Sequence, residues 1–234
     1  MRKRTLCVLL VLFIPAAIAL FALQEEPKPA KLYIRATIYP TFSLSRYDYN
    51  NDIDLVRIRT YIELRKDSQT GEVIPDAEIA INSQPLDFKE DHYEKRIPVD
   101  KENLPEKISL RIVVPEEPTI EETYPIPDWL TILSPKPAIF DPDIPLSLKW
   151  NFQKNKRPVN AIVYDFKSGE NILRENDIEK TEVIIPAEKI PGETIVRLYV
   201  ISAWIFKKWI IGENVARGSE INMIPWSQVF IRTK

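Results

Sequence analysis

The sequence predicts an all-β protein with two β-sandwich domains in tandem behind an N-terminal apolar export segment. From residue 31 onward, apolar and polar residues alternate in short runs, and no apolar stretch has helical spacing. Turns rich in proline and acidic residues separate these runs, and 20 of the 234 residues are proline. Residues 6–23 are apolar throughout apart from Pro15. The alternation predicts strands, the turns predict their ends, and the apolar run predicts export.

The first segment, residues 1–24, reads as a signal peptide or a membrane anchor. A basic cluster at residues 2–4 precedes the apolar run 6–23, whose length lies between a secretory leader and a membrane-spanning helix of about 20 residues. Residues 17–19 (Ala-Ile-Ala) offer a cleavage site, but four apolar residues follow, so cleavage and anchoring both stay open. The basic cluster stays cytoplasmic in either case. We therefore expect a periplasmic, cell-surface or secreted protein that meets the membrane only through residues 6–23.

Composition excludes several function classes and leaves no expected cofactor. The five glycines stand far apart, whereas phosphate and dinucleotide cradles need clustered glycines. His92 and Cys7 are the single histidine and cysteine, so metal centres and Cys-His nucleophile pairs are not expected. Cys7 also precedes most of the apolar run, which excludes it as a lipidation site. Without the basic cluster, 29 basic residues face 34 acidic ones, and nucleic acid is not an expected partner.

The first β-sandwich domain is expected over residues 30–114. Its strands are expected where side chains alternate between apolar and polar, with a turn at residues 67–71. These runs cover residues 31–39, 56–64, 77–82, 86–88, 93–97 and 108–114. About seven strands in so short a stretch are typical of a sandwich.

A linker is expected over residues 115–128. Four prolines and four glutamates crowd this stretch. Proline cannot donate to a ladder of backbone hydrogen bonds and stiffens the chain toward extended geometry. The segment therefore predicts a semi-rigid connection between the domains.

The second domain is expected over residues 129–234. Its candidate strands repeat the same alternation between turn-rich segments. They cover residues 129–133, 146–150, 159–166, 182–185, 194–204 and 228–232. Residues 206–226 are the least regular part of the chain and give no assignment.

This second region resembles a fibronectin type III or related immunoglobulin-like domain. The resemblance is carried by Leu-Ser-Leu-Lys-Trp at 146–150, a later Ser-Gly turn, and Ile-Pro-Ala-Glu-Lys-Ile-Pro-Gly-Glu-Thr at 185–194 before the strand 196–203. It implies that Trp150 packs in the core and that Tyr199 helps to fix a corner. Residues 70–82 of the first region are similar to immunoglobulin-like or carboxypeptidase-regulatory-like sandwiches of exported bacterial proteins. Such resemblances concern architecture and imply almost no function.

An acidic turn at residues 48–54 places side-chain oxygens at alternate positions, as a calcium loop does. The pattern then departs from a calcium loop, because Ile53 stands where a sharp bend needs glycine and Arg59 where a bidentate glutamate belongs. Asp and Asn also favour turns for local backbone reasons. We therefore expect a loop before a long strand and no metal site, with calcium as the open alternative.

The candidate binding residues are Trp204, Phe206 and Trp209. Together with the isoleucines at 205, 210 and 211, they supply more apolar surface than one strand can turn inward. Part of it is expected to form a contact patch. The alternative is that most of these residues close the open end of the second sandwich or its junction with the first.

Catalysis has the least support in the sequence. Acidic pairs such as Asp141 with Asp143, or Asp76 with Glu78, are expected by chance among 34 carboxylates. His92 lies in a polar turn with no second histidine. We expect no enzyme, but an exported binding, spacer or assembly module of the cell envelope that contacts an envelope or extracellular protein. The alternative function is a carbohydrate-binding accessory protein that uses exposed aromatics of the second domain.

Overall fold

The computed structural model describes residues 31–44, 56–151, 158–203 and 205–234. Within these ranges the chain is built almost entirely of strands, with one 3-10 turn at Ala187–Lys189. The described residues contain no helix long and apolar enough to cross a membrane. The expected export segment and the acidic turn 48–54 lie outside the described residues. The predicted all-β fold is confirmed.

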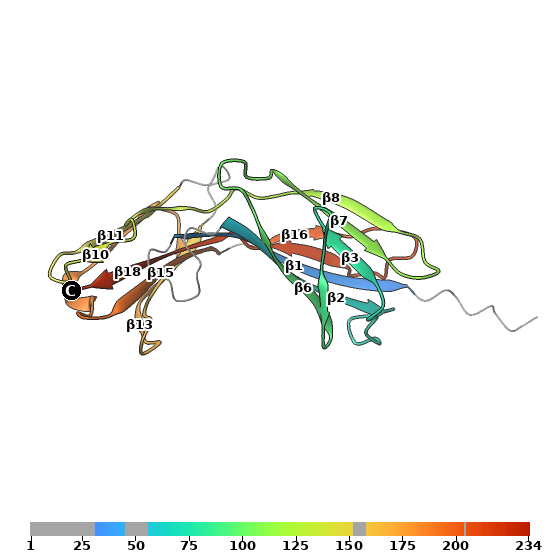
Figure 1. The fold of residues 1–234 in the computed structure, drawn as a ribbon, viewed down its shortest axis with the longest axis horizontal. Coiled ribbons are helices and arrows are strands. Elements are labelled where there is room, and N and C mark those ends of the chain that lie inside the picture. Colours follow the sequence, from blue (N-terminus) through green and yellow to red (C-terminus); the bar gives the residue numbers. More distant parts are fainter. Residues whose placement is uncertain (1–30, 45–55, 152–157, 204) are drawn as a thin grey trace, which may run out of the picture. The chain divides into compact units, whose positions relative to one another are not determined.

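The described strands form one large sheet and two small ones (Figure 1). The eleven strands of the large sheet are β1 (Leu32–Leu44), β2 (Val56–Lys66), β5 (Asp87–Lys89), β6 (His92–Pro98), β10 (Ile139–Phe140), β12 (Val159–Asp165), β13 (Asn171–Ile178), β15 (Ile195–Ser202), β16 (Phe206–Trp209), β17 (Glu220–Met223) and β18 (Trp226–Thr233). A four-stranded sheet contains β3 (Glu78–Ile81), β4 (Gln84–Pro85), β7 (Lys107–Val113) and β8 (Ile120–Pro125). A three-stranded sheet contains β9 (Ile132–Ser134), β11 (Leu146–Trp150) and β14 (Glu182–Ile185).

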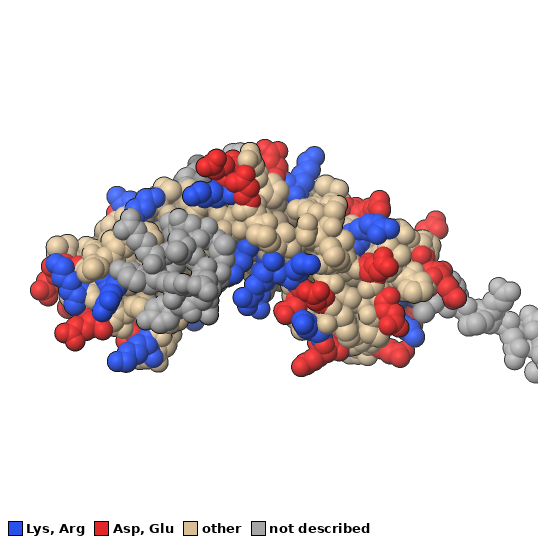
Figure 2. Space-filling model, in the orientation of Figure 1, with Lys and Arg blue, Asp and Glu red and all other residues tan. Residues whose placement is uncertain are grey.

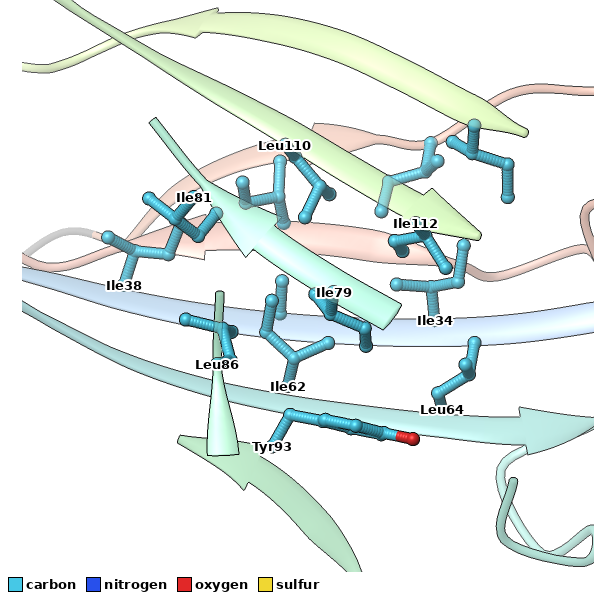
Figure 3. Packing of buried hydrophobic residues seen from close by; sticks show 14 of the residues in the cluster. Ile34, Ile38, Ile62, Leu64, Ile79, Ile81, Leu86, Tyr93, Leu110 and Ile112 are labelled. Carbon is cyan, nitrogen blue, oxygen red and sulfur yellow. The ribbon is translucent and has the colours of Figure 1, made fainter. Parts of the chain in front are cut away.

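The first hydrophobic core lies between the four-stranded sheet and the part of the large sheet that contains β1 and β2. Alternation decides which residues enter it, because successive side chains of a strand point to opposite faces. Ile34 and Ile38 of β1 face Ile79 of β3 and Leu110 of β7, and all four are buried (Figure 3). Tyr93 lies in the same core, where its hydroxyl donates to the Ile74 carbonyl at 2.8 Å.

The second core lies between the three-stranded sheet and the part of the large sheet that contains β12, β15 and β18. Leu148, Val163, Leu198 and Ile231 are buried there. Trp150 is buried in the same cluster, as the resemblance to fibronectin type III-like domains implies. The prediction of two β-sandwiches is thus confirmed.

The two sandwiches are not successive segments of the chain. After the second sandwich has begun, β16 and β17 return to the first: Ile210, Ile221 and Met223 belong to its core. β1 runs parallel to β17 over its first half and parallel to β18 over its second half. The large sheet is therefore continuous from one core to the other.

The structure differs from the sequence-based expectation at three other places. The range 115–128, expected as a linker, contains strand β8, which pairs with β7 and buries Ile120 and Tyr124 in the first core. Residues 129–133 pair only from Ile132 onward, as β9. Tyr199 lies on β15 with its ring 5.0 Å from that of Trp226, and it is not part of the second core cluster.

Candidate binding surface

Two of the three residues that the sequence singled out, Phe206 and Trp209, lie on β16. This strand pairs with β17, and β17 pairs with β1, so β16 is an edge strand among the described residues. We call the segment from Ile205 to Ser219, without the side chains that point into the core, the 205–219 surface. Trp209 is 58% exposed and Ile211 is 81% exposed on this surface. Ile210 between them is buried in the first core.

The turn after β16 is held to the start of β1 by backbone and side-chain hydrogen bonds. The Leu32 amide donates to the Asn214 carbonyl at 2.7 Å, and the Ala216 amide donates to the Leu32 carbonyl at 2.8 Å. The buried Ser219 hydroxyl accepts from the Ile34 amide at 3.0 Å and donates to the Ala216 carbonyl at 2.9 Å. Gly218 has a φ of +93°, which side chains rarely adopt. These contacts fix the turn that contains Ile211.

Trp209 lines two hollows in the surface. The first has a volume of about 480 Å³ and is lined by residues 209–212 and 215–219. The second has a volume of about 410 Å³ and is lined by Tyr33, Arg35, Ser68, Gln69, Trp209, Arg217, Gly218 and Glu220. The first is more apolar because isoleucine, valine and alanine side chains line it, whereas charged and polar groups surround the second. The indole is therefore placed to contact a ligand in either hollow.

Glu220 follows the 205–219 surface directly and is the centre of its charged interactions. Its carboxylate pairs with Lys207, accepts a hydrogen bond from Asn222 at 2.8 Å, and lies 4.0 Å from the Arg35 guanidinium. Burial alone raises the pKa of Glu220, but the hydrogen bonds from Lys207 and Asn222 and the nearby positive charges outweigh it and lower the pKa below its usual value. The Lys207 ammonium also lies 4.5 Å from the centre of the Trp209 ring. One face of the indole is thus covered by a cation, although the side chain as a whole stays exposed.

The structure places two of the three candidate binding residues, and their environments differ. Trp209 lies exposed at the end of β16. Phe206, on the same strand, is half-buried and packs against the first core, so it supports the surface from below. Trp204 lies outside the described residues. Ile211 belongs to the exposed set, and Glu220 was not predicted, because its position opposite Trp209 depends on the pairing of β16 with β17.

The other candidate groups do not form a reactive site in the part of the chain that is described. The His92 ring stacks on Tyr61 at 4.1 Å, and its Nδ1 lies 3.0 Å from the Asp91 carboxylate. Asp141 lies 3.4 Å from the Lys234 ammonium at the surface. Among the described residues, no three His, Cys, Asp or Glu side chains gather where they could hold a metal ion. Figure 2 shows acidic and basic side chains interspersed over the face in view.

No family model matches this chain. No curated protein matches it either. Among solved structures it is similar to the trypsin-activated alpha-2-macroglobulin of Escherichia coli, with 7% identity, 86% of this chain and 15% of that chain covered, and a TM-score of 0.27. It is also similar to SGBP-B of the Bacteroides ovatus mixed-linkage glucan utilization locus, solved with a mixed-linkage heptasaccharide, with 8% identity, coverage of 89% and 62%, and a TM-score of 0.25.

A third similar structure contains the fibronectin(III)-like modules of Clostridium thermocellum CbhA, with 13% identity, coverage of 85% and 94%, and a TM-score of 0.26. The chain spans less than two thirds of the length of the first two proteins. At these TM-scores the likeness carries no argument beyond the all-β class that the sheets already show.

Proposed function

We propose that this chain is an exported, non-catalytic module of the cell envelope that holds a protein partner at the 205–219 surface. The observation that carries the proposal is the pair of large apolar side chains, Trp209 and Ile211, exposed at 58% and 81% beside an apolar hollow. Exposed apolar groups around a hollow are typical of interaction sites. Tryptophan also contributes disproportionately to the binding energy of protein interfaces.

The partner is held by side chains rather than by strand addition at the β16 edge. Lys207 and Lys208 are both exposed on this four-residue strand. Lysines on a short edge strand disfavour pairing with a further strand. The hollow of about 480 Å³ beside Trp209 instead suits an apolar side chain of the partner. Its lining turn is fixed by the Ser219 hydrogen bonds, so little ordering is needed on binding.

A carbohydrate ligand is the second candidate function. The exposed indole of Trp209 and the polar second hollow favour it, because a sugar ring stacks on a flat aromatic face while polar groups bind its hydroxyls. Lys207 covers one face of that indole, and Trp209 is the single exposed tryptophan among the described residues. The apolar first hollow therefore favours the protein partner.

Site-specific photo-crosslinking tests the proposal in cells that produce the full chain. A benzophenone amino acid replaces Ile211, and in a matched control it replaces Ile184, which is 55% exposed on the three-stranded sheet. We expect a defined protein adduct from position 211 that Trp209→Ala abolishes, and no such adduct from position 184. The proposal fails if position 211 gives no adduct, or if the Trp209→Ala variant keeps it. Binding to a glycan array that Trp209→Ala abolishes would instead support the sugar alternative.

A further inference from the structure

A second cluster of aromatic residues surrounds an arginine on the outer face of the large sheet. Arg197 lies in β15 between Val196 and Leu198, which are both buried in the second core. Because successive side chains alternate, Arg197 points away from that core. Its register partners are Tyr164 on β12 and Phe230 on β18.

Four rings lie close to the guanidinium of Arg197. Its central carbon is 5.5 Å from the ring centre of Tyr199, 5.8 Å from those of Tyr164 and Phe230, and 6.0 Å from that of Trp226. Each distance is within the range of a cation–π interaction. We call these five residues the Arg197 cluster, and each of them is half-buried.

The guanidinium is held in one orientation from below. Its Nε donates to Oε1 of Gln228 at 2.9 Å, and Nε2 of Gln228 donates to the Ser43 hydroxyl at 2.8 Å. Gln228 and Ser43 are both buried. These hydrogen bonds thus engage Nε of Arg197 and fix the plane of its guanidinium group.

The two terminal nitrogens of Arg197 are left for a ligand. No described carboxylate forms a salt bridge with this residue. No hydrogen bond joins the terminal nitrogens of Arg197 to a described residue, and these nitrogens are not among the buried polar atoms of the described residues that lack a partner. Among the described residues, the cluster therefore presents a half-buried positive charge whose two terminal nitrogens have no carboxylate partner.

We propose that the Arg197 cluster binds the carboxylate of an acidic side chain of a protein partner. A guanidinium fork matches a carboxylate with two parallel hydrogen bonds. The rings lower the local dielectric, which strengthens that pairing, and they offer apolar contact around it. Tyr, Trp and Arg are the residue types most enriched at interface positions that dominate binding.

An acidic sugar fits the cluster less well. Stacking of a sugar ring requires an open aromatic face, and the guanidinium lies over one face of each of the four rings. An aspartate or glutamate side chain needs only the open end of the fork. This site lies on strands other than β16 and does not depend on the proposed function of the 205–219 surface.

The test uses the full chain and two blocked pentapeptides, Leu-Ala-Glu-Ala-Leu and the same peptide with a central glutamine. Binding is followed by NMR at the Arg197 side-chain N–H and the Trp226 indole N–H. We expect the glutamate peptide to bind at least tenfold more tightly than the glutamine peptide at low salt. Arg197→Gln should bring this ratio to about one. Arg174→Gln on the exposed strand β13 is the control and should leave the ratio unchanged.

Several outcomes would overturn the proposal: equal binding of the two peptides, no binding of either, or an unchanged ratio in Arg197→Gln. Tighter binding of oligogalacturonate than of the glutamate peptide, lost in Arg197→Gln, would assign the site to acidic sugars instead. If Arg197→Gln lowers the unfolding midpoint so far that it is not folded, Arg197→Lys replaces it. Lysine keeps the charge but not the fork, so the ratio should fall at least threefold, and an unchanged ratio would again exclude the site.

Discussion

The Ser227 hydroxyl of β18 donates a hydrogen bond of 2.9 Å to the Phe42 carbonyl of β1, 185 residues away in the sequence. The same hydroxyl accepts a hydrogen bond of 3.1 Å from the Ile132 amide of β9. One buried side chain thus joins the first strand of the large sheet, its last strand and the small sheet that covers the second core.

Ser227→Ala should lower the free energy of unfolding by about 1–3 kcal/mol, because it leaves the buried Ile132 amide without its acceptor. Urea unfolding at neutral pH measures the change. Ser109→Ala removes an exposed hydroxyl that contacts Asn82 and should change the free energy by less than about 0.5 kcal/mol. Equal effects of the two substitutions would contradict the role assigned to Ser227.

The continuous large sheet should make both cores unfold together. Ile62→Ala in the first core and Leu198→Ala in the second each remove a fully buried side chain, at a cost of about 2–5 kcal/mol. We expect one calorimetric transition in the parent chain, and each substitution should move that single transition downward. Two transitions, each moved by only one substitution, would show that the cores are independent.

Tyr124 should make the protein sensitive to alkaline pH. Its buried hydroxyl has no hydrogen-bond partner among the described residues, and burial, aided by the charge of Glu122, raises its pKa to about 12. Because this pKa is higher in the folded state, the contribution of Tyr124 to stability is fully present below pH 10. It is lost as pH rises from 10 toward 12. Tyr124→Phe should therefore flatten the decline of unfolding free energy over this range.

The same substitution should leave stability at pH 7 unchanged or raise it by about 1 kcal/mol, since it removes an unpaired buried polar group. Part of the alkaline decline should remain, because burial also raises the pKa of Tyr199 to about 12. Urea unfolding at several pH values measures both effects. A variant as sensitive to alkali as the parent would exclude Tyr124 as a source.

Glu220 should contribute to stability at neutral pH and lose that contribution in acid. Its pKa is lowered in the folded state, so its contribution is present above the ordinary glutamate pKa and is lost as pH falls below it. Glu220→Gln should lower the unfolding free energy at pH 7 by about 1 kcal/mol, and this loss should shrink as pH falls below the ordinary glutamate pKa. Glu72→Gln, at an exposed pair with Lys66, is the control and should show no such loss at pH 7. A loss in Glu220→Gln that does not shrink in acid would contradict this account.

The sequence predicted those strands whose alternation is clear. Residues 182–185 and 146–150 form β14 and β11 with the predicted bounds. It did not predict β13, because most residues of Asn171–Ile178 are polar and exposed, so no apolar face marks the strand. Strand β8 was obscured by its flanking prolines, although Ile120 and Tyr124 point into the core.

Alternation shows which side chains enter a core but not which strand lies beside which. The parallel pairing of β1 with β17 therefore could not be predicted, and neither could the position of Glu220 opposite Trp209. The sequence indicated that part of the apolar surface near Trp209 would be exposed, because residues 204–211 carry more apolar side chains than one strand can turn inward. The Arg197 cluster escaped prediction since its members come from three strands, β12, β15 and β18.

The parallel pairing of β1 with β17 and β18 also constrains the order of events during synthesis. Because the chain emerges from its N-terminal end, β1 must wait for almost the whole polypeptide before its second neighbour exists. Pairing of strands so distant in the sequence is slow. Until it forms, the backbone hydrogen-bonding groups along one edge of β1 can pair with other chains. We therefore expect a nascent chain of this kind to depend on a chaperone until β18 has been made.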